Sequence, residues 1–176
     1  WYLLKGRFVA LSKKAFGIAL IIATLFSLAQ LLSGHHSAEG VAVNQPAKLA
    51  AMEGHFEASA PADMYLLGWV DPDAEAVRGI GIPGGLSFLL EYNTSAPVTG
   101  LKAFPEDERP GQVNAVFQFY HIMISIGMLL IVITLYGSWQ LWKGTLFDKR
   151  WVLWVFVWAV FLPQISNQAG WFASEM

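Results

Sequence analysis

Residues 15–34, AFGIALIIATLFSLAQLLSG, form an apolar segment without a charged side chain. About 20 apolar residues are enough for a helix to cross the hydrocarbon core of a bilayer. Two further segments of this kind lie at 113–142 and 151–176, and the last ends beside a glutamate. The chain is 55% hydrophobic, with a mean hydropathy of +0.46, which excludes an ordinary soluble domain. The sequence therefore predicts an all-α integral membrane protein whose three transmembrane helices belong to a larger helical bundle.

The charged residues predict how these helices are oriented. Segment 1–14 is interpreted as the end of a preceding helix followed by a basic stretch, and 143–150 as a short turn; together they contain seven cations and one acid. Segment 35–112 contains four cations and eleven acids. Because basic residues favour the cytoplasmic side, we expect 143–150 inside and 35–112 outside. The net charge of −2 offers no basic field for nucleic acid, and the absence of cysteine excludes disulfides and thiolate metal sites.

The outer segment 35–112 is too long for a simple connection, so we expect it to have a partial fold of its own. Its glycine-rich stretch 79–85, GIGIPGG, lacks the lysine and the strand-then-helix context of a phosphate-binding loop. We interpret it as a flexible turn. Residues 86–92 could form a short strand or a short helix.

A polar motif, QPAKLAAME, stands at 45–53 near the start of this outer segment. Pro46 suits the first turn of a helix, and Gly54 should weaken the helix at its other end. The helix would carry Lys48 and Glu53 at or near the membrane surface. Such a pair could hold a polar head group and accept its proton. It could equally be a solvated ion pair on a loop helix.

The second span contains two side chains that are unusual in a membrane, His121 and Met123. A histidine there needs a cavity, a hydrogen-bond partner or a cofactor, and a methionine thioether can be an axial ligand of haem iron. Tyr120, Met123 and Gly127 share one helix face, where Gly127 leaves room for a flat macrocycle. The alternatives are that Met123 fills the core, that Gly127 marks a close helix crossing, and that His121 is a buried, hydrogen-bonded histidine.

The third span should be kinked at Pro163. Beyond the kink, one face carries a polar stripe that suggests a lined cavity or a proton path rather than lipid contact. Its members are Gln164, Gln168, Trp171 and Glu175. Glu175 should lie near the outer boundary, where it could also be an interfacial acid in water. Met123 and Glu175 would then share the outer half of the membrane with Lys48 and Glu53.

Several stretches resemble subunit I of the cytochrome bd quinol oxidases. The most specific are QPAKLAAME at 45–53 and NQAGWFASE at 167–175; WYLLKGR at 1–7, APVTGLK at 96–102 and YHIM at 120–123 support them. The resemblance covers essentially the whole chain in the family's order. Because Trp1–Leu4 is also typical of an interrupted apolar run, we expect an internal piece of a longer membrane protein.

The resemblance implies a role for each unusual residue. Lys48 and Glu53 match residues that bind and oxidise quinol. Met123 matches an axial ligand of the low-spin haem b, and Glu175 an iron ligand beside the high-spin haem b and haem d. His121 and Trp171 would contact the cofactors.

The implied protein is an electrogenic oxidase of the prokaryotic cytoplasmic (inner) membrane that oxidises ubiquinol or menaquinol outside and reduces oxygen to water. It would contain haem d or a third haem b at the oxygen site. It would work with subunit II and, as further partners, small single-helix subunits and membrane lipid.

One departure from the family pattern concerns His121, where well-known members carry arginine. A titratable group in place of a permanent cation puts the haem potential or the haem complement in doubt. Two alternatives therefore stay open. One is a divergent relative that oxidises quinol without reducing oxygen, and the other is a membrane transport or structural protein without haem.

Overall fold

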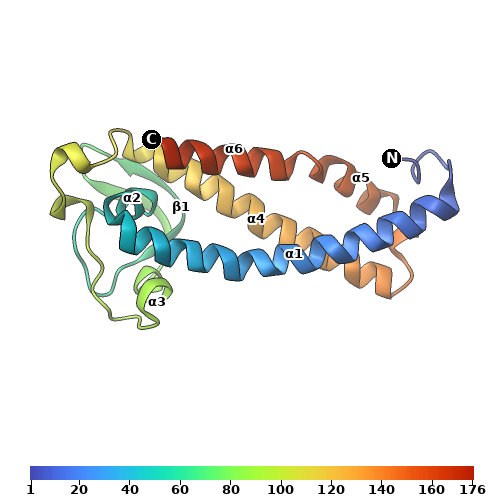
Figure 1. The fold of residues 1–176 in the computed structure, drawn as a ribbon, viewed down its shortest axis with the longest axis horizontal. Helices are drawn as coiled ribbons and strands as arrows, with labels where there is room; N and C mark the ends of the chain where they lie inside the picture. Colours follow the sequence, from blue (N-terminus) through green and yellow to red (C-terminus); the bar gives the residue numbers. More distant parts are fainter. The chain divides into compact units, whose positions relative to one another are not determined.

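The computed structural model describes all residues, 1–176, and the chain divides into two compact units. Unit 1 contains residues 1–32 and 124–167, and unit 2 contains residues 33–123 and 168–176. Three helical stretches are long and apolar enough to cross a membrane: Val9–Asn44, Glu106–Trp142 and Arg150–Glu175. This confirms the predicted class of fold. Figure 1 labels the larger elements in chain order.

The elements have the following bounds. The helices are α1 (Val9–Asn44), α2 (Pro46–Met52), α3 (Gly85–Glu91), α4 (Val113–Trp142), α5 (Arg150–Ala159) and α6 (Leu162–Glu175). The strands are β1 (Met64–Asp71) and β2 (Ala76–Ile82), and the short 3₁₀ turns are η1 (Leu101–Ala103), η2 (Glu106–Glu108) and η3 (Leu146–Asp148).

Helix α1 continues ten residues beyond the apolar segment predicted at 15–34 and ends only at Asn44. Local side-chain contacts support this polar extension. The Ser37 hydroxyl donates to the carbonyl of Ser33 (2.9 Å), the Asn44 amide donates to the carbonyl of Gly40 (2.8 Å), and Glu39 lies within ion-pair distance of His35 (3.4 Å). Such contacts between residues three and four apart stabilise a helix where apolar packing is absent.

In unit 1, hydroxyl side chains join α1 to α4. Thr24 bonds Ser138 (2.7 Å) and Ser27 bonds Thr134 (3.0 Å), contacts of the kind that hold helices together where there is no water. Helix α5 approaches α4 closely at Gly137, where an added Cβ would lie 2.5 Å from the ring of Phe156.

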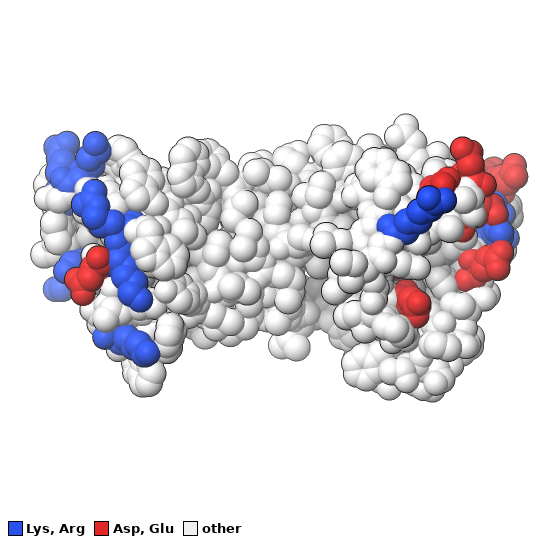
Figure 2. Space-filling view, turned by 180° about the vertical axis from the view of Figure 1, so that it is seen from behind, with Lys and Arg blue, Asp and Glu red and all other residues white.

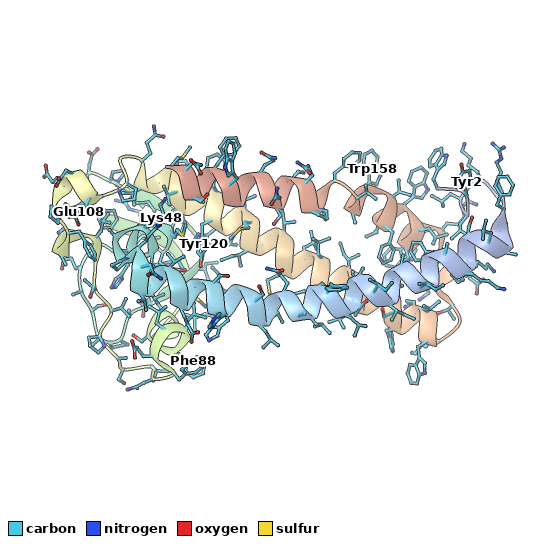
Figure 3. The ribbon with its side chains drawn as sticks, in the orientation of Figure 1. Tyr2, Lys48, Phe88, Glu108, Tyr120 and Trp158 are labelled. Atoms are coloured by element: carbon cyan, nitrogen blue, oxygen red, sulfur yellow. The ribbon has the colours of Figure 1, made fainter.

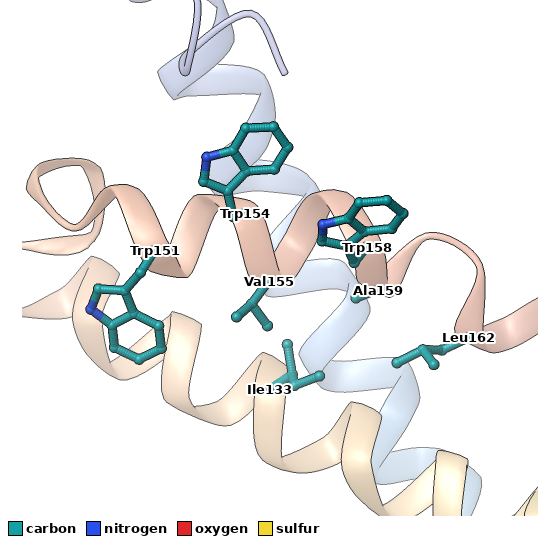
Figure 4. Close-up of a pocket in the computed structure, with 7 residues that line it drawn as sticks. All are labelled: Ile133, Trp151, Trp154, Val155, Trp158, Ala159 and Leu162. Atoms are coloured by element: carbon teal, nitrogen blue, oxygen red, sulfur yellow. The ribbon is translucent and has the colours of Figure 1, made fainter.

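An apolar groove of about 470 Å³ lies along α5 in unit 1. Figure 4 shows its lining residues, which are Ile133, Trp151, Trp154, Val155, Trp158, Ala159 and Leu162. The tryptophans are 40–66% exposed. Tryptophans of this kind are typical of anchors at the boundary between membrane and water.

Pro163 coincides with a complete interruption of the third span. Helix α5 ends at Ala159 and α6 begins at Leu162, so that Pro163 lies in the first turn of the new helix. A proline has no N–H for the bond that would continue the preceding helix, but it is tolerated in a first turn. The kink expected from the sequence is therefore a break between two helices.

The charges divide between the units as the sequence suggests. Unit 1 contains seven Lys and Arg with Asp148 as its acid, and unit 2 contains four Lys and Arg with twelve acids. Figure 2 shows the basic side chains gathered on unit 1 and most of the acidic ones on unit 2.

In unit 2, the glycine-rich stretch 79–85 is a strand as far as Ile82 and a turn at Pro83 and Gly84, so its interpretation as a turn was wrong for its first half. Strand β2 pairs antiparallel with β1, and Gly79 lies opposite Gly68. A Cβ on Gly79 would stand 2.6 Å from the Cα of Gly68. The glycines therefore permit close approach of two backbones. Residues 85–91, for which strand and helix were both open, form α3.

The core of unit 2 forms where α2, the β1–β2 hairpin and the start of α4 meet. Its buried residues are Ala50, Ala51, Met52, Phe56, Val70, Leu101, Val116, Phe117 and Ala173. A smaller cluster under α3 contains Ala62, Leu86 and Val98. The outer segment thus has the partial fold that its length predicted.

Candidate functional site

Helix α2 places Glu53 at its C-terminal end. Pro46 begins the helix after Gln45, as the sequence predicted, and the Glu53 N–H donates to the carbonyl of Leu49 (3.0 Å). Gly54 then turns the chain with a φ of +63°, a conformation that glycine adopts without strain. This turn directs Glu53 inward, where it is only 2% exposed. The alternative of a solvated ion pair with Lys48 is therefore wrong.

Glu53 is surrounded by polar groups of α4. The Tyr120 hydroxyl donates to its carboxylate, and the His121 ring lies next to it. The second carboxylate oxygen, Oε2, is buried without a hydrogen-bond partner. Burial raises the pKa of Glu53, whereas His121 and the Tyr120 hydroxyl oppose this effect. A buried carboxyl with a raised pKa and a vacant acceptor is well suited to receive a proton.

His121 is held by two backbone carbonyls. Its Nδ1 lies 2.8 Å from the carbonyl oxygen of Phe117, and its Nε2 lies 2.8 Å from that of Tyr65. The imidazole also stacks on the Phe117 ring at a centroid distance of 3.9 Å. Because carbonyl oxygens only accept, a ring nitrogen that bonds one of them carries a hydrogen. Two backbone carbonyls and an aromatic ring thus hold the buried imidazole in place.

Lys48 points away from Glu53 and toward α6, where its ammonium group donates to the carbonyl of Ser174. It also lines a pocket of about 450 Å³ together with other polar and charged residues, among them Asn44, Gln45, Glu108 and Arg109. Figure 3 labels Lys48 and Tyr120 within unit 2. Lys48 therefore places a cation at the edge of this pocket, next to Ser174, the residue that precedes Glu175.

Met123 lies one helical turn beyond Tyr120 and is partly buried. Its sulfur faces Gly170 of α6, where an added Cβ would stand only 2.6 Å from Sδ. Around Gly127 nothing lies within 4 Å of an added Cβ. The alternative that Gly127 marks a close helix crossing is therefore wrong.

Glu175 and Trp171 are exposed, with Trp171 at 56%, and so are Gln164 and Gln168. The opposite face of α6 buries Ala169 and Ala173. The polar stripe of α6 therefore faces away from the protein's own contacts. No group of three or more His, Asp or Glu side chains is placed to hold a metal ion.

All six candidate residues belong to unit 2. Glu53 and His121 are brought together, Lys48 reaches the backbone next to Glu175, and Met123 stands one turn beyond the tyrosine that bonds Glu53. Sequence reasoning missed Asn114 and Gln118, two side chains of α4 that bond the backbone of β1. Their spacing of four residues, with His121 three further on, was the available signal.

This fold and site define a class of helical membrane protein. In it, a buried carboxyl stands at the end of a short surface helix, and a methionine lies one turn beyond the tyrosine that bonds this carboxyl. The sequence model of cytochrome bd terminal oxidase subunit I matches residues 1–176, and the chain belongs to this family.

Individual relatives agree with this assignment. The chain is 37% identical over 171 residues to a Bacillus subtilis (strain 168) protein named "Putative cytochrome bd menaquinol oxidase subunit I", covering 95% of this chain and 38% of the relative. It is 27% identical over 241 residues to the cytochrome bd-II ubiquinol oxidase subunit 1 of Escherichia coli (strain K12), covering 99% and 47%.

Among solved structures, the bd oxidase from Geobacillus thermodenitrificans matches with a TM-score of 0.88 and 35% identity. The match covers 99% of this chain and 40% of the solved one. The chain thus spans less than half the length of each of these proteins.

Proposed function

We propose that this chain supplies the quinol-oxidising region of a cytochrome bd type quinol:oxygen oxidoreductase, with Glu53 as the acceptor of a quinol proton. The observation that carries the proposal is the buried carboxyl of Glu53, with one oxygen bonded by Tyr120 and the other unpartnered. A quinol hydroxyl that donates to Oε2 would satisfy this oxygen and could pass its proton to it. A carboxylate that is left unpartnered in a buried site is otherwise costly.

Lys48 would bind the head group by donating a hydrogen bond to a quinol oxygen. The pocket that it lines lies at the start of α2, and a charged donor forms a stronger hydrogen bond to a head-group oxygen than a neutral donor does. Oxidation of one quinol releases two protons and two electrons. Glu53 accepts the two protons one after the other and passes each on to water, which the orientation predicted from the charge bias places on the outer side of a prokaryotic cytoplasmic membrane. The relatives' names include both menaquinol and ubiquinol, so the proposal concerns quinols as a class.

The residues of this chain fit haem as single axial donors. Met123 offers a partly buried thioether, and Glu175 offers an exposed carboxylate. Met123 would hold the low-spin haem b and Glu175 the high-spin haem b, with haem d or a third haem b beside it. When bound, these haems would accept quinol electrons one at a time and deliver them to oxygen. Both sites need further ligands from the whole protein, which would also include subunit II.

The test is a pair of matched variants in the complete complex. Glu53→Gln keeps the shape of the side chain but accepts no proton, so quinol oxidation should fall at least about a hundredfold while the haem absorption stays unchanged. Glu57→Gln, which removes an exposed acid four residues later, should retain activity. Full activity in Glu53→Gln would refute the proposal, and loss of the haem spectrum in that variant would make Glu53 part of a haem site instead. Oxygen consumption by the wild-type complex separates the oxidase from a relative that only oxidises quinol.

A further inference from the structure

The free edge of the β1–β2 hairpin is bonded by a row of side chains on α4. The oxygen Oδ1 of Asn114 accepts from the Val70 N–H (3.1 Å), and the Gln118 amide donates to the Gly68 carbonyl (2.8 Å). His121 follows on the same face, bonded to the Tyr65 carbonyl. Gln118 also donates to Asn114 (3.3 Å), so the row is continuous. These side chains take the place of a third strand along β1.

A β-bulge brings the last of these carbonyls into line. Alternate residues of a strand direct their backbone groups to the same edge, which places Val70 and Gly68 toward α4. Between Tyr65 and Leu67 the register shifts by one residue, and this shift turns the Tyr65 carbonyl to the same edge as the Gly68 carbonyl. Bulges re-aim backbone and side-chain groups in this way. The hairpin is thus fitted to α4 along its whole length.

The hairpin covers the turn that holds Glu53. An added Cβ on Gly54 would lie 2.5 Å from Cγ2 of Val77 and 3.2 Å from Cγ2 of Val70. Val70 is fully buried in the same core as Met52 and Phe117. The hairpin therefore packs directly on the residue that follows Glu53, and it forms part of the cover that excludes water from the carboxyl.

We propose that Asn114 and Gln118 are positioning residues for Glu53: they hold the hairpin over its carboxyl and so set the pH range in which it accepts a proton from quinol. The inference rests on the proposed function of Glu53. It concerns residues that contact neither the head group nor a haem in the proposed site, and that act through the strand they hold.

Few titratable side chains lie around Glu53. Helix α4 contributes Tyr120 and His121, and the hairpin contributes Tyr65, which packs against the shared core. On α2, Lys48 is directed to Ser174. The charged residues of the two strands, Asp71 and Arg78, pair with each other at 3.8 Å, and Glu75 in the turn between the strands pairs with Lys102. Burial is the largest influence on the pKa of Glu53 and raises it, so loosening the hairpin should admit water and lower that pKa.

The experiment compares Gln118→Ala and Asn114→Ala with Gln112→Ala in the complete complex. Gln112 is an exposed residue just before α4 and supplies a matched loss of an amide. The rate of quinol oxidation at saturating quinol is measured against pH, and hydrogen exchange is measured over residues 64–71. If the inference holds, exchange in β1 speeds up in the first two variants, and the acid limb of their profiles moves to lower pH by about half a unit or more. Gln112→Ala leaves both unchanged.

Faster exchange in β1 with an unmoved acid limb would overturn the inference, and so would unchanged exchange in both variants. A simple loss of assembly lowers the amount of active complex but does not move the limb, so the profile separates positioning from stability. Asn114→Ala removes one acceptor only, which keeps the test usable if Gln118→Ala fails to assemble. An active Glu53→Gln variant would instead refute the proposed function, which distinguishes the two failures.

Discussion

The Nε2 atom of His121 lies 2.8 Å from the carbonyl oxygen of Tyr65, a residue 56 positions earlier in the chain. This bond joins α4 to the hairpin at the level of Glu53, and Met123 follows two residues later on the same helix. One turn of α4 thus carries both Tyr120, which bonds the proposed proton acceptor, and Met123, the proposed haem ligand. A single rigid helix provides both contacts, which suits a reaction in which proton and electron leave the same molecule.

Gly54 is the residue least tolerant of a side chain near the site. Its φ of +63° and the 2.5 Å from an added Cβ to Val77 mean that Gly54→Ala is strained in its backbone and clashes with the hairpin. We expect the free energy of unfolding to fall by about 1–3 kcal/mol. This should appear as a lower thermal midpoint of the purified complex and as faster hydrogen exchange over residues 64–82. Gly111→Ala, where nothing lies within 4 Å, is the control. Equal midpoints for the two variants would contradict the packing of the hairpin on Gly54.

Met123 should determine the spin state of one haem. Met123→Leu removes the thioether, so the low-spin signal in the reduced-minus-oxidised optical spectrum should become high-spin. An unchanged spectrum would exclude Met123 as a ligand.

Gly170 gives an independent test of the same site. Gly170→Ala keeps the thioether of Met123 but puts a methyl group 2.6 Å from the present position of Sδ. We expect a shifted low-spin band with full haem content, because the sulfur must move. Gly40→Ala, on α1 with nothing within 4 Å, should leave the band where it is. A band that moves equally in both variants would indicate a general effect.

Lys48 should affect quinol binding more than the chemical step. Lys48→Met retains an apolar side chain of similar length and removes the charged donor. Loss of one charged hydrogen bond of about 1.4 kcal/mol corresponds to about a tenfold rise in KM, with kcat nearly retained. Lys102→Met, which removes a cation paired with Glu57 and Glu75, should leave KM unchanged. A fall in kcat at unchanged KM would rule out this role for Lys48.

His55 should make unit 2 less stable in acid. Burial is the main cause that lowers its pKa below the ordinary 6.5, so the folded protein favours the neutral ring. The contribution of the neutral ring to the free energy of unfolding is fully present above about pH 6.5. It is lost as the pH falls through the lowered pKa of the folded protein. In His55→Gln, where an amide can still donate to the Val98 carbonyl, this loss should disappear. Thermal midpoints measured from about pH 7 to about pH 5 would show a shallower slope for the variant; parallel slopes would exclude His55 as the source.

Much of the fold could be predicted because it follows from apolar length and from proline. The three spans, the start of α2 at Pro46 and the interruption at Pro163 are local consequences of the sequence. The hairpin could not be predicted, because Gly79 and Gly81 give β2 little of the alternation that identifies a strand. Its strands are stabilised by contacts with α2 and α4 that lie far away in the sequence.

The candidate site could be predicted only in part, because its contacts also join residues that lie far apart in the sequence. The sequence identified Glu53 and Met123 as unusual, but nothing local shows that Glu53 turns inward while Lys48 turns toward α6. The row formed by Asn114, Gln118 and His121 was visible as a polar face on an apolar helix. These side chains bond the edge of β1, and the sequence pattern did not show that β1 is a strand.

The most direct test of the central claim follows the proton onto Glu53 itself. Infrared difference spectra of the complete complex, recorded as quinol is oxidised, should show the C=O stretch of a newly protonated carboxyl. This band should vanish in Glu53→Gln and remain in Glu57→Gln. A band of full strength in Glu53→Gln would mean that another group takes the proton, and it would contradict the role of Glu53 as the acceptor.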